Sequence, residues 1–365
     1  MSTSLKKLFI SGGHLTPALS AIDEIRMRKV PWEIVFIGRK TSMEGFKDEA
    51  HEEREVHAKN IRFLPLIAGR LQRTLTINTI ISLFKIPIGF IQAIYYCLRE
   101  RPDAVLSFGG YVALPIVVSA AFFHIPVISH EQTSVPGLAN KIIALYATKI
   151  CVTFEETRTL FPKNKVVFTG LPVRNDMFIS QSQPSWVKDT LKSPIIYITG
   201  GSTGSTSLNA LIFPLISCLT EKYFVIHQTG RLSFDQAILL KQKNYILKDY
   251  FEIEEVSWIF QHAALIVGRS GANTVMEIAM TGNIGLFIPL PWSGGGEQMK
   301  NAQWLEKQGT AEILPQAQAN PGRLMQNIQK ILSASTIYGD RAKKLSLRIQ
   351  RDGAKLLIDE VARFV

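Results

Sequence analysis

Cysteine is scarce in this 365-residue sequence. The three cysteines, Cys97, Cys151 and Cys218, are odd in number, far apart in the chain and without a C-x-x-C pair. This spacing argues against a disulfide framework of the kind found in small secreted proteins, and it offers no zinc-binding pattern. We therefore expect three reduced cysteines that pack as small core residues in a reducing compartment.

The N-terminus lacks the apolar stretch of a signal peptide. Only Leu8, Phe9 and Ile10 are apolar before Ser11 and glycines follow. Low-complexity tracts and obvious repeats are also missing, and a content of 46% hydrophobic and 19% charged residues is typical of a globular protein. The sequence therefore predicts a folded cytoplasmic protein, long enough for two domains with separate cores.

Acidic residues are outnumbered by basic residues, 30 against 41, which gives a formal net charge of +11. Such a balance suits an anionic partner, either nucleic acid or an acidic lipid surface. The chain shows no RNA-binding signature and no basic helix interleaved with aromatic residues. We therefore expect no nucleic acid partner, and an anionic membrane surface is the favoured alternative.

The stretch from Gly69 to Leu98 contains no acidic residue and is mostly apolar. Its basic residues Arg70, Arg73 and Lys85, together with Pro87, argue against a helix that spans a membrane. Part of the stretch must belong to the core. The functional alternative is a basic, apolar helix that lies in the headgroup region of a membrane.

Short apolar runs recur along the chain, and each is followed by glycine or polar residues and then by a helix-like stretch. Continuous apolar runs are typical of parallel strands buried on both faces, and their alternation with helices predicts βαβ units. Ligands bind such sheets beyond the carboxyl ends of the strands. The runs are Leu8–Ile10, Glu33–Ile37, Ala104–Ser107, Ile125–Ser129, Ile195–Thr199, Phe224–Ile226 and Leu265–Val267.

A polar stretch between Gly170 and Pro194 separates two series of these units. We therefore predict an α/β fold of two Rossmann-like domains, residues 1–175 and 176–341. Their parallel sheets are expected to face each other across a cleft lined by glycine-rich loops.

The segment Gly200–Ser205 follows a strand and opens a helix. Backbone N–H groups in a tight glycine turn at a helix N-terminus favour a phosphate. The spacing is neither G-x-G-x-x-G nor that of a P-loop, and the next strand ends in His227 and Gln228 without an acidic residue for a nicotinamide ribose. A bare structural turn and a phosphate site are both compatible with this segment, whereas an NAD site is not favoured.

The segment Gly268–Glu277 also opens a helix, with Ser270 or Gly271 as the cap. Its free N–H groups suit a diphosphate. Asn273 and Glu277 are four residues apart and share one face, where a carboxylate can accept both hydroxyl hydrogens of a ribose. A helical Glu is by itself usually only solvated, so the neighbouring loop is what makes Glu277 a candidate.

His14 follows two glycines at the end of the first strand and precedes Pro17, which suits the first turn of a helix. A lone histidine is more often structural. Its position at the mouth of a glycine loop and its ordinary pKa near 6.5 nevertheless make it a candidate general base.

Eight groups of residues, spread from about Leu8 to Leu314, match one family in order. They resemble the UDP-N-acetylglucosamine–N-acetylmuramyl-(pentapeptide) pyrophosphoryl-undecaprenol N-acetylglucosamine transferases of peptidoglycan synthesis, which belong to glycosyltransferase family 28 and have the GT-B fold. The matching groups are Gly12–His14 with Pro17–Leu19, Phe108–Tyr111, His130–Gln132 with Gly137–Lys141, Pro172–Arg174, Gly200–Gly204, His227–Gly230, Arg269–Ala272 with Glu277, and Gln298 with Asn301–Ala302.

The resemblance implies an inverting transfer of N-acetylglucosamine from UDP-N-acetylglucosamine to a lipid-linked pyrophosphoryl muramyl acceptor. It implies a peripheral enzyme on the cytoplasmic face of the cell membrane, docked through the N-terminal domain, with a last helix (residues 342–365) that packs back on that domain. It implies no metal and no other cofactor, and the chain contains no Asp-x-Asp motif.

The resemblance also distributes the site residues. The candidate bases are His14 and Glu131. The donor would be bound by Arg174, Gly200, Gly201, Ser202, Gly204, Arg269, Ser270, Gly271, Glu277 and Gln298. The acceptor would be bound by Gly12, Gly13, Gly109, Gly110, Tyr111, Thr133 and Asn140.

The chain departs from the family pattern at three places. The first glycine loop is shortened before His14, Thr133 stands where the family usually has Asn, and Glu297 stands in a usual pair of glutamines. These changes fall at the acceptor and sugar contacts, whereas the nucleotide residues match. The alternatives are therefore a related transferase with another lipid acceptor, a UDP-sugar 2-epimerase of the same fold, and a non-catalytic subunit.

Overall fold

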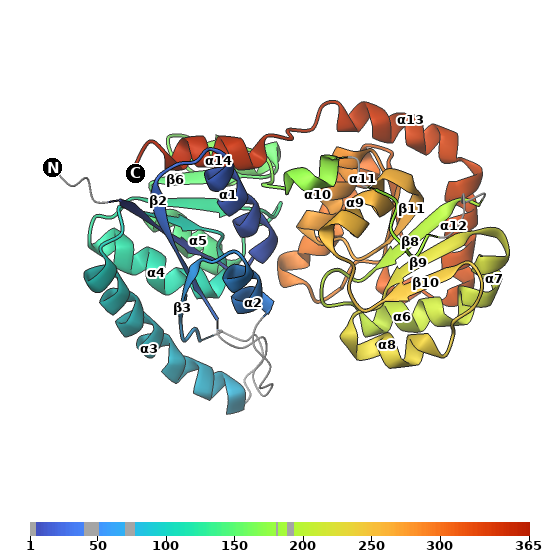
Figure 1. Ribbon diagram of the computed structural model, residues 1–365, viewed down its shortest axis with the longest axis horizontal. Helices are drawn as coiled ribbons and strands as arrows, with labels where there is room; N and C mark the ends of the chain where they lie inside the picture. The colour runs from blue at the N-terminus through green and yellow to red at the C-terminus, as the bar shows by residue number, and fades with distance from the viewer. Residues whose placement is uncertain (1–4, 40–50, 70–76, 180–181, 188–192) are drawn as a thin grey trace. The chain divides into compact units, whose positions relative to one another are not determined.

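The computed structural model describes residues 5–39, 51–69, 77–179, 182–187 and 193–365. The chain divides into two compact units (Figure 1). The N-terminal unit comprises Met1–Arg174 and Arg351–Val365, and the C-terminal unit comprises Asn175–Gln350. The change from one unit to the other lies within the border predicted between Gly170 and Pro194.

The N-terminal unit contains a seven-stranded parallel sheet in the order β3-β2-β1-β4-β5-β6-β7. Its strands are buried on both faces, which explains the continuous apolar runs. In β1, for example, Leu8 and Ile10 pack into one core while Phe9 packs into the other. The strands are β1 (Lys6–Ser11), β2 (Trp32–Gly38), β3 (Arg62–Pro65), β4 (Ala104–Ser107), β5 (Val127–Glu131), β6 (Lys149–Val152) and β7 (Val166–Phe168).

Helices cover both faces of this sheet. One core is closed by α1 (Leu15–Met27), α2 (His51–Ala58) and α14 (Gly353–Val361), and the other by α3 (Ile77–Glu100), α4 (Gly110–Phe122) and α5 (Leu138–Tyr146). A 3-10 helix, Glu155–Leu160, lies between β6 and β7.

The C-terminal unit contains a six-stranded parallel sheet in the order β10-β9-β8-β11-β12-β13. Its strands are β8 (Ile195–Thr199), β9 (Phe224–Gln228), β10 (Tyr245–Lys248), β11 (Ala263–Gly268), β12 (Gly285–Phe287) and β13 (Ala311–Ile313). Its helices are α6 (Thr206–Ile212), α7 (Ile216–Lys222), α8 (Arg231–Ile238), α9 (Ile253–His262), α10 (Ala272–Thr281), α11 (Glu297–Lys307), α12 (Pro321–Ser333) and α13 (Ser335–Ser346). Two parallel sheets confirm the predicted α/β class.

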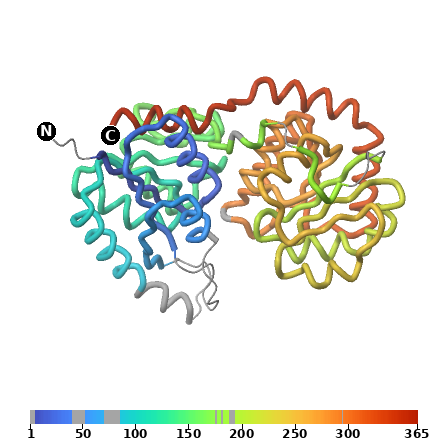
Figure 2. The backbone as a smooth tube through the Cα atoms, viewed as in Figure 1, coloured from blue at the N-terminus to red at the C-terminus, as the bar shows by residue number. Residues whose placement is uncertain are grey.

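The C-terminal end of the chain returns to the N-terminal unit later than predicted. The expected segment 342–365 begins inside α13, which packs against α10 of the C-terminal unit. Only from Arg351 onward does the chain belong to the N-terminal unit, where α14 packs on α1 (Figure 2). A Cβ at Gly353 would stand 2.2 Å from the carbonyl oxygen of Leu171, so the start of α14 needs a residue without a side chain.

Both sheets reverse their strand order at one point. In the N-terminal unit the order turns between β1 and β4, and in the C-terminal unit it turns between β8 and β11. The helices that follow these strands cover opposite faces of the sheet, and in folds of this kind ligands bind where the strand order reverses. The glycine loops predicted from the sequence follow these four strands.

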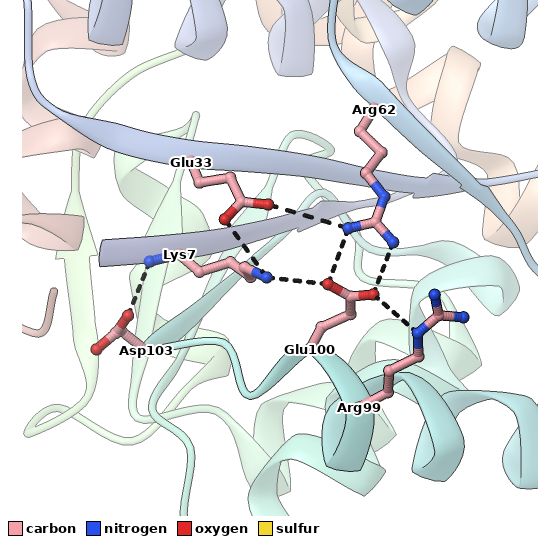
Figure 3. Close-up of polar contacts among 6 residues, drawn as sticks. All are labelled: Lys7, Glu33, Arg62, Arg99, Glu100 and Asp103. Carbon is pink, nitrogen blue, oxygen red and sulfur yellow. Dashed lines mark hydrogen bonds and ion pairs between the residues drawn. The ribbon is translucent and has the colours of Figure 1, made fainter. Parts of the chain in front are cut away.

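Charged residues at the other end of the N-terminal sheet, where β1, β2 and β3 begin, hold the C-terminal end of α3 (Figure 3). Glu100 accepts hydrogen bonds from Lys7 Nζ at 2.9 Å and from Arg62 at 2.7 and 2.9 Å, and Glu33 and Arg99 complete the cluster. Hydrogen bonding to Arg62, and then to Lys7, lowers the pKa of Glu100 to about 2. These contacts fasten α3 to β1 and β3.

Candidate functional site

The loop Gly200–Ser205 connects β8 to α6 at the C-terminal switch point. Gly201 and Gly204 have φ angles of 84° and 74°, a region in which residues with side chains are strained. The Oγ of Ser205 caps α6 by accepting a hydrogen bond from the N–H of Leu208. Ser202 is exposed at the tip of the turn. The loop therefore presents backbone N–H groups and one hydroxyl in the arrangement that favours a phosphate.

The neighbouring strand β9 supports this loop. Gln228 donates from Nε2 to the carbonyl oxygen of Gly201 at 2.9 Å. A Cβ at Gly204 would stand 2.4 Å from the Thr229 carbonyl oxygen, and one at Gly230 would stand 2.5 Å from the Thr203 carbonyl oxygen. The two loops thus touch backbone to backbone, which requires glycine on both sides.

His227 is an internal support. Its ring nitrogens lie 2.9 Å from the Tyr245 hydroxyl and 3.1 Å from Asn209 Oδ1, and it is fully buried. Burial lowers the pKa of His227 to about 3, so the ring is neutral. Asn209 in turn donates to the carbonyl oxygen of Thr229 at 2.7 Å. Asn209 was missed by the sequence reasoning because nothing in the local sequence marks a helical Asn as buried.

Arg269 follows β11 and is only 4% exposed. Its guanidinium donates to Ser205 Oγ at 3.1 Å, to Ser207 Oγ at 2.6 Å, to the Ile288 carbonyl oxygen at 2.5 Å and to Gln316 Oε1 at 2.7 Å. Burial lowers the pKa of Arg269 to about 10, which leaves it charged at neutral pH. The predicted donor contact is therefore corrected in one respect: Arg269 spends four of its five N–H groups on supporting the loop from inside.

The helix α10 begins at Gly271 without a side-chain cap. A Cβ at Gly271 would have no atom within 4 Å, and the first N–H groups of α10 have no partner within the helix. Ser270 is fully buried and donates from Oγ to the carbonyl oxygen of Gln298 at 2.7 Å, so its hydroxyl is a tie between two loops. Glu277 is partly buried one turn after Asn273, on the same helix.

Gln298 lies in the first turn of α11, the helix that follows β12, and belongs to the C-terminal site. Its side-chain Oε1 accepts a hydrogen bond from the N–H of Leu290 at 3.0 Å, and its own N–H donates to Ser293 Oγ at 3.2 Å. Because the side-chain oxygen is engaged, the amide NH2 is the group that can donate to a ligand. We call Gly200–Ser205, Arg269–Gly271, Glu277 and Gln298 the C-terminal loop cluster.

At the N-terminal switch point, the loops after β1 and β4 are in direct contact. The N–H of Gly13 donates to the carbonyl oxygen of Gly109 at 3.0 Å. A Cβ at Gly12 would stand 2.5 Å from Phe108 Cβ, and Gly110 has a φ of 78°. The N–H of Gly110 donates to Asn140 Oδ1 at 2.7 Å.

Glu131 joins the predicted acceptor residues to one another. Its Oε1 accepts from the N–H and from the hydroxyl of Thr133 at 2.9 and 2.7 Å, and its Oε2 accepts from Asn140 Nδ2 at 2.7 Å. The residue is 2% exposed, and burial raises its pKa. Both carboxylate oxygens are thus engaged inside the unit, which favours a positioning role for Glu131, and its role as a base remains a prediction.

His14 stands at the N-cap of α1 without a side-chain hydrogen bond to the helix. The residue keeps part of its surface exposed, and desolvation lowers its pKa below the usual 6.5. Its ring is therefore neutral at neutral pH and can accept a proton. The other histidine of this region, His130, is 1% exposed and contacts the carbonyl oxygen of Gly170 at 3.1 Å, so it belongs to the scaffold.

Arg174 was predicted to bind the donor. The structure assigns it to the N-terminal unit, where its Nη2 lies 3.7 Å from Glu55 Oε2. Its Nε is buried and has no hydrogen-bond partner. A contact between Arg174 and the donor remains a prediction.

The sequence reasoning also passed over Arg39. Its Nη1 donates to the hydroxyl of Tyr111 at 2.6 Å. We call Gly12–His14, Gly109–Tyr111, Glu131, Thr133, Asn140 and Arg39 the N-terminal loop cluster. The signal that could have found Arg39 is a basic residue placed immediately after Gly38, at the end of a strand beside β1.

Within the residues that the structure describes, no group of three or more His, Cys, Asp or Glu side chains is arranged to hold a metal ion. Each loop cluster is thus built from glycine turns, hydroxyls, amides and one buried charged side chain.

Comparison with known proteins covers both loop clusters. The model of the glycosyltransferase family 28 N-terminal domain matches residues 11–152, and that of the family 28 C-terminal domain matches residues 195–357. A curated UDP-N-acetylglucosamine–N-acetylmuramyl-(pentapeptide) pyrophosphoryl-undecaprenol N-acetylglucosamine transferase from Clostridium novyi (strain NT) is 32% identical over 333 residues, which are 90% of either chain. The protein of the same name from Treponema denticola is 32% identical over 354 residues, 92% of this chain and 89% of that protein.

Two solved structures complete the comparison. MurG from Acinetobacter baumannii has a TM-score of 0.74 and 27% identity, with 98% of this chain and 99% of that chain covered. The UDP-GlcNAc 2-epimerase from Neisseria meningitidis, solved with UDP-GlcNAc, has a TM-score of 0.67 and 13% identity, with 98% and 100% covered. The second likeness shows a shared fold alone.

Proposed function

This chain belongs to glycosyltransferase family 28, and from that premise we propose that it transfers N-acetylglucosamine from UDP-N-acetylglucosamine to a lipid-linked pyrophosphoryl muramyl acceptor, converting lipid I to lipid II in peptidoglycan synthesis. Its fold is GT-B, as the sequence predicts. The observation that carries the proposal is the near-full-length match, at 32% identity, to relatives whose name states this reaction. The family domains also contain both loop clusters. The 2-epimerase alternative is not favoured, because that likeness is confined to the fold.

The C-terminal loop cluster supplies the chemistry that the donor needs. The N–H groups of Gly200–Ser205 and of the start of α10 bind the diphosphate, and the buried positive charge of Arg269 stabilises the negative charge that develops on departing UDP. Glu277 accepts the ribose hydroxyls, and the amide NH2 of Gln298 donates to the sugar. Each of these roles is inferred from the hydrogen-bond donors, the acceptors or the charge that the residue presents.

His14 is the proposed base of the N-terminal loop cluster. The acceptor hydroxyl attacks the anomeric carbon of the sugar, the bond from that carbon to the diphosphate oxygen breaks, and UDP leaves with the bonding electrons. The hydroxyl proton passes to the neutral ring of His14. Attack opposite to the leaving group inverts the anomeric carbon. Glu131 holds Thr133 and Asn140 in place for the acceptor.

A membrane surface is the proposed location of the acceptor. The helix α3 packs on α4, and α4 packs on α5 (Figure 1). Ile91 and Leu98 on α3 are 68% and 55% exposed, and Phe122 at the end of α4 is 74% exposed. Exposed apolar side chains on one layer of a chain with a net charge of +11 suit an anionic headgroup region.

None of the helices in the described parts of the chain has both the length and the apolar character needed to cross a membrane. Arg70 and Arg73, which belong to the predicted basic stretch, lie outside the described residues. We propose peripheral attachment at the cytoplasmic face of the cell membrane, without a nucleic acid partner, a resident metal or another cofactor.

Labelled UDP-N-acetylglucosamine and a lipid-linked pyrophosphoryl muramyl analogue test the reaction. The purified protein should transfer label to the lipid, equally in a chelator, and Glu277→Ala should not. Glu254→Ala, which removes an exposed carboxylate from α9, is the matched control. Failure with this acceptor, combined with transfer to an uncharged lipid or conversion of the UDP-sugar without any acceptor, would overturn the proposal in favour of the corresponding alternative.

A further inference from the structure

Arg39 lies among the loops of the N-terminal switch point. Ser11 of β1 is paired in register with Ile37 of β2 on one side and with Ser107 of β4 on the other. Residues just beyond these positions therefore leave the sheet at the same level. Arg39 is two residues beyond Ile37, and its guanidinium reaches the hydroxyl of Tyr111, at the start of the helix that follows β4.

The guanidinium of Arg39 is positioned by Tyr111, but not all of its N–H groups have a hydrogen-bond acceptor. Its Nη1 donates to the Tyr111 hydroxyl at 2.6 Å, and the guanidinium carbon lies 5.4 Å from the centre of the Tyr111 ring. Its Nε is buried and has no hydrogen-bond partner. A buried N–H of a cation without an acceptor is costly, so such a group calls for an explanation.

A neighbouring carboxyl, Glu52, only partly offsets this charge at neutral pH. Glu52 Oε2 accepts from the backbone N–H of Arg39 at 3.3 Å, which fixes the start of the side chain. Burial raises the pKa of Glu52 to about 7, so the carboxyl is only partly ionised there.

Tyr111 supplies a second donor beside the guanidinium. Because its hydroxyl oxygen accepts from Arg39, its hydroxyl hydrogen points to another acceptor. A guanidinium N–H and a hydroxyl O–H side by side form a charge-assisted pair of donors that matches two oxygens of a phosphate.

We propose that Arg39 and the Tyr111 hydroxyl together bind one phosphate of the acceptor's pyrophosphate, and that Arg39 makes the enzyme prefer a pyrophosphate-linked acceptor to an uncharged lipid. The inference rests on the proposed function and adds to it a specificity-determining residue. The sequence context of Arg39, directly after a strand that neighbours β1, is what allows one side chain to serve both the loop cluster and the ligand.

Steady-state kinetics with Arg39→Gln, Arg39→Lys and Tyr111→Phe test the proposal. Arg39→Gln should raise the KM for the pyrophosphate-linked acceptor by about 10- to 100-fold and leave the KM for the UDP-sugar unchanged. Arg39→Lys keeps the charge but loses the planar fork, so its acceptor KM should lie between those of the wild type and Arg39→Gln. The double variant Arg39→Gln/Tyr111→Phe should lose less than the product of the two single losses, because both groups act on one phosphate.

Arg158→Gln is the matched control. Arg158 is a half-exposed arginine of the same unit that forms an ion pair with Glu155 at 3.6 Å, and its loss should change neither KM. Thermal unfolding of each variant shows whether it is folded. If Arg39→Gln does not fold, the kinetics of Arg39→Lys still test the proposal.

Calorimetric titration of inorganic pyrophosphate separates this inference from the proposed function. The wild type should bind pyrophosphate at least tenfold more tightly than Arg39→Gln, whether or not the transfer reaction is detected. An acceptor KM and a pyrophosphate affinity that are the same in Arg39→Gln as in the wild type would overturn the assignment. Absence of transfer by the wild type, with the difference in pyrophosphate affinity intact, would instead count against the proposed reaction alone.

Discussion

The two units use the same backbone device but bury charges of opposite sign behind it. Each has adjacent parallel strands at a reversal of strand order, with glycine loops that pack backbone to backbone. Behind the C-terminal loops lies a cation, Arg269, and behind the N-terminal loops lies a carboxyl group, Glu131, both nearly inaccessible to solvent. Topology therefore provides the place for the loops in both units, whereas the buried side chain that supports them differs from one unit to the other.

The largest effect on this comparison is expected from His14→Ala. If His14 is the base, removal of its ring should lower kcat by about 10²- to 10⁴-fold while UDP affinity, a property of the C-terminal unit, stays unchanged. Because desolvation lowers the pKa of His14, the acid limb of kcat/KM should lie well below pH 6.5.

Steady-state kinetics and UDP calorimetry check this prediction. His57→Ala, which removes a half-exposed histidine of the same unit, is the control and should retain activity. A kcat for His14→Ala within tenfold of the wild type would remove His14 from the reaction.

The next largest effect is expected from Arg269→Met. The methionine roughly fills the space but leaves Ile288, Gln316 and two serines without their donor. Unfolding free energy should fall by about 3 kcal/mol, and UDP affinity by about 100-fold, because a buried cation and its hydrogen bonds are lost together.

Chemical denaturation and UDP calorimetry measure both quantities, with the exposed Arg323→Met as control. Normal UDP affinity in a destabilised Arg269→Met would mean that the buried charge serves the fold alone. The contrast between the two units would then have no bearing on the donor.

Much of this arrangement could be predicted from the sequence, and the reason is physical. Strands buried on both faces are continuously apolar, and the glycines that follow them mark turns that other residues cannot adopt. Local patterns therefore predicted the strands next to the loops and the edge that they share. The short strands β3, β6, β7, β10, β12 and β13 were missed. Contacts between distant segments left no such pattern: Arg269 bonds to Ile288 and Gln316, and His227 bonds to Asn209 and Tyr245.

The same limit applies at Glu131 and at the C-terminal end of the chain. Glu131 is a base candidate by residue type, and only the fold shows that Thr133 and Asn140 engage both of its oxygens. The return to the N-terminal unit was placed at residue 342 from the family resemblance, and the sequence does not say which unit α13 and α14 each cover. The residues that each helix contacts place the boundary at Arg351, and the local sequence pattern does not show these contacts.

A smaller effect is expected at the other end of the N-terminal sheet, where ion pairs serve structure alone. Glu100→Gln should lower the unfolding free energy by about 2 kcal/mol at pH 7, because Lys7 and Arg62 lose a nearly buried carboxylate. The folded state lowers the pKa of Glu100 from 4.5 to about 2. Its contribution is therefore complete above pH 4.5 and is lost as the pH falls toward 2.

Denaturation curves at pH 7 and pH 3 compare Glu100→Gln with the wild type. The difference between them should shrink at the lower pH. Glu155→Gln, at an exposed ion pair, should change stability by less than about 0.5 kcal/mol. A difference that is the same at both pH values would show that the charge of Glu100 is not what holds α3.

The smallest effect is expected from Glu131→Gln, which tests most directly whether the two buried side chains play the same role in their units. Glutamine keeps the shape and one oxygen of the side chain. Its NH2 group is a donor, however, and would face the hydrogen-bond donors of Thr133 or of Asn140 without an acceptor between them. Asn140 cannot turn its amide to accept without giving up the N–H of Gly110. If Glu131 positions the loops, the acceptor KM should rise about tenfold, equivalent to about 1.4 kcal/mol, with kcat nearly unchanged. If Glu131 were the base, kcat would instead fall by about 10²-fold or more, with acceptor binding retained. Glu156→Gln, at an exposed carboxylate of the same unit, is the control. The split between KM and kcat thus decides whether the buried carboxyl of the N-terminal unit supports its loops as Arg269 supports those of the C-terminal unit, or takes part in the chemistry itself.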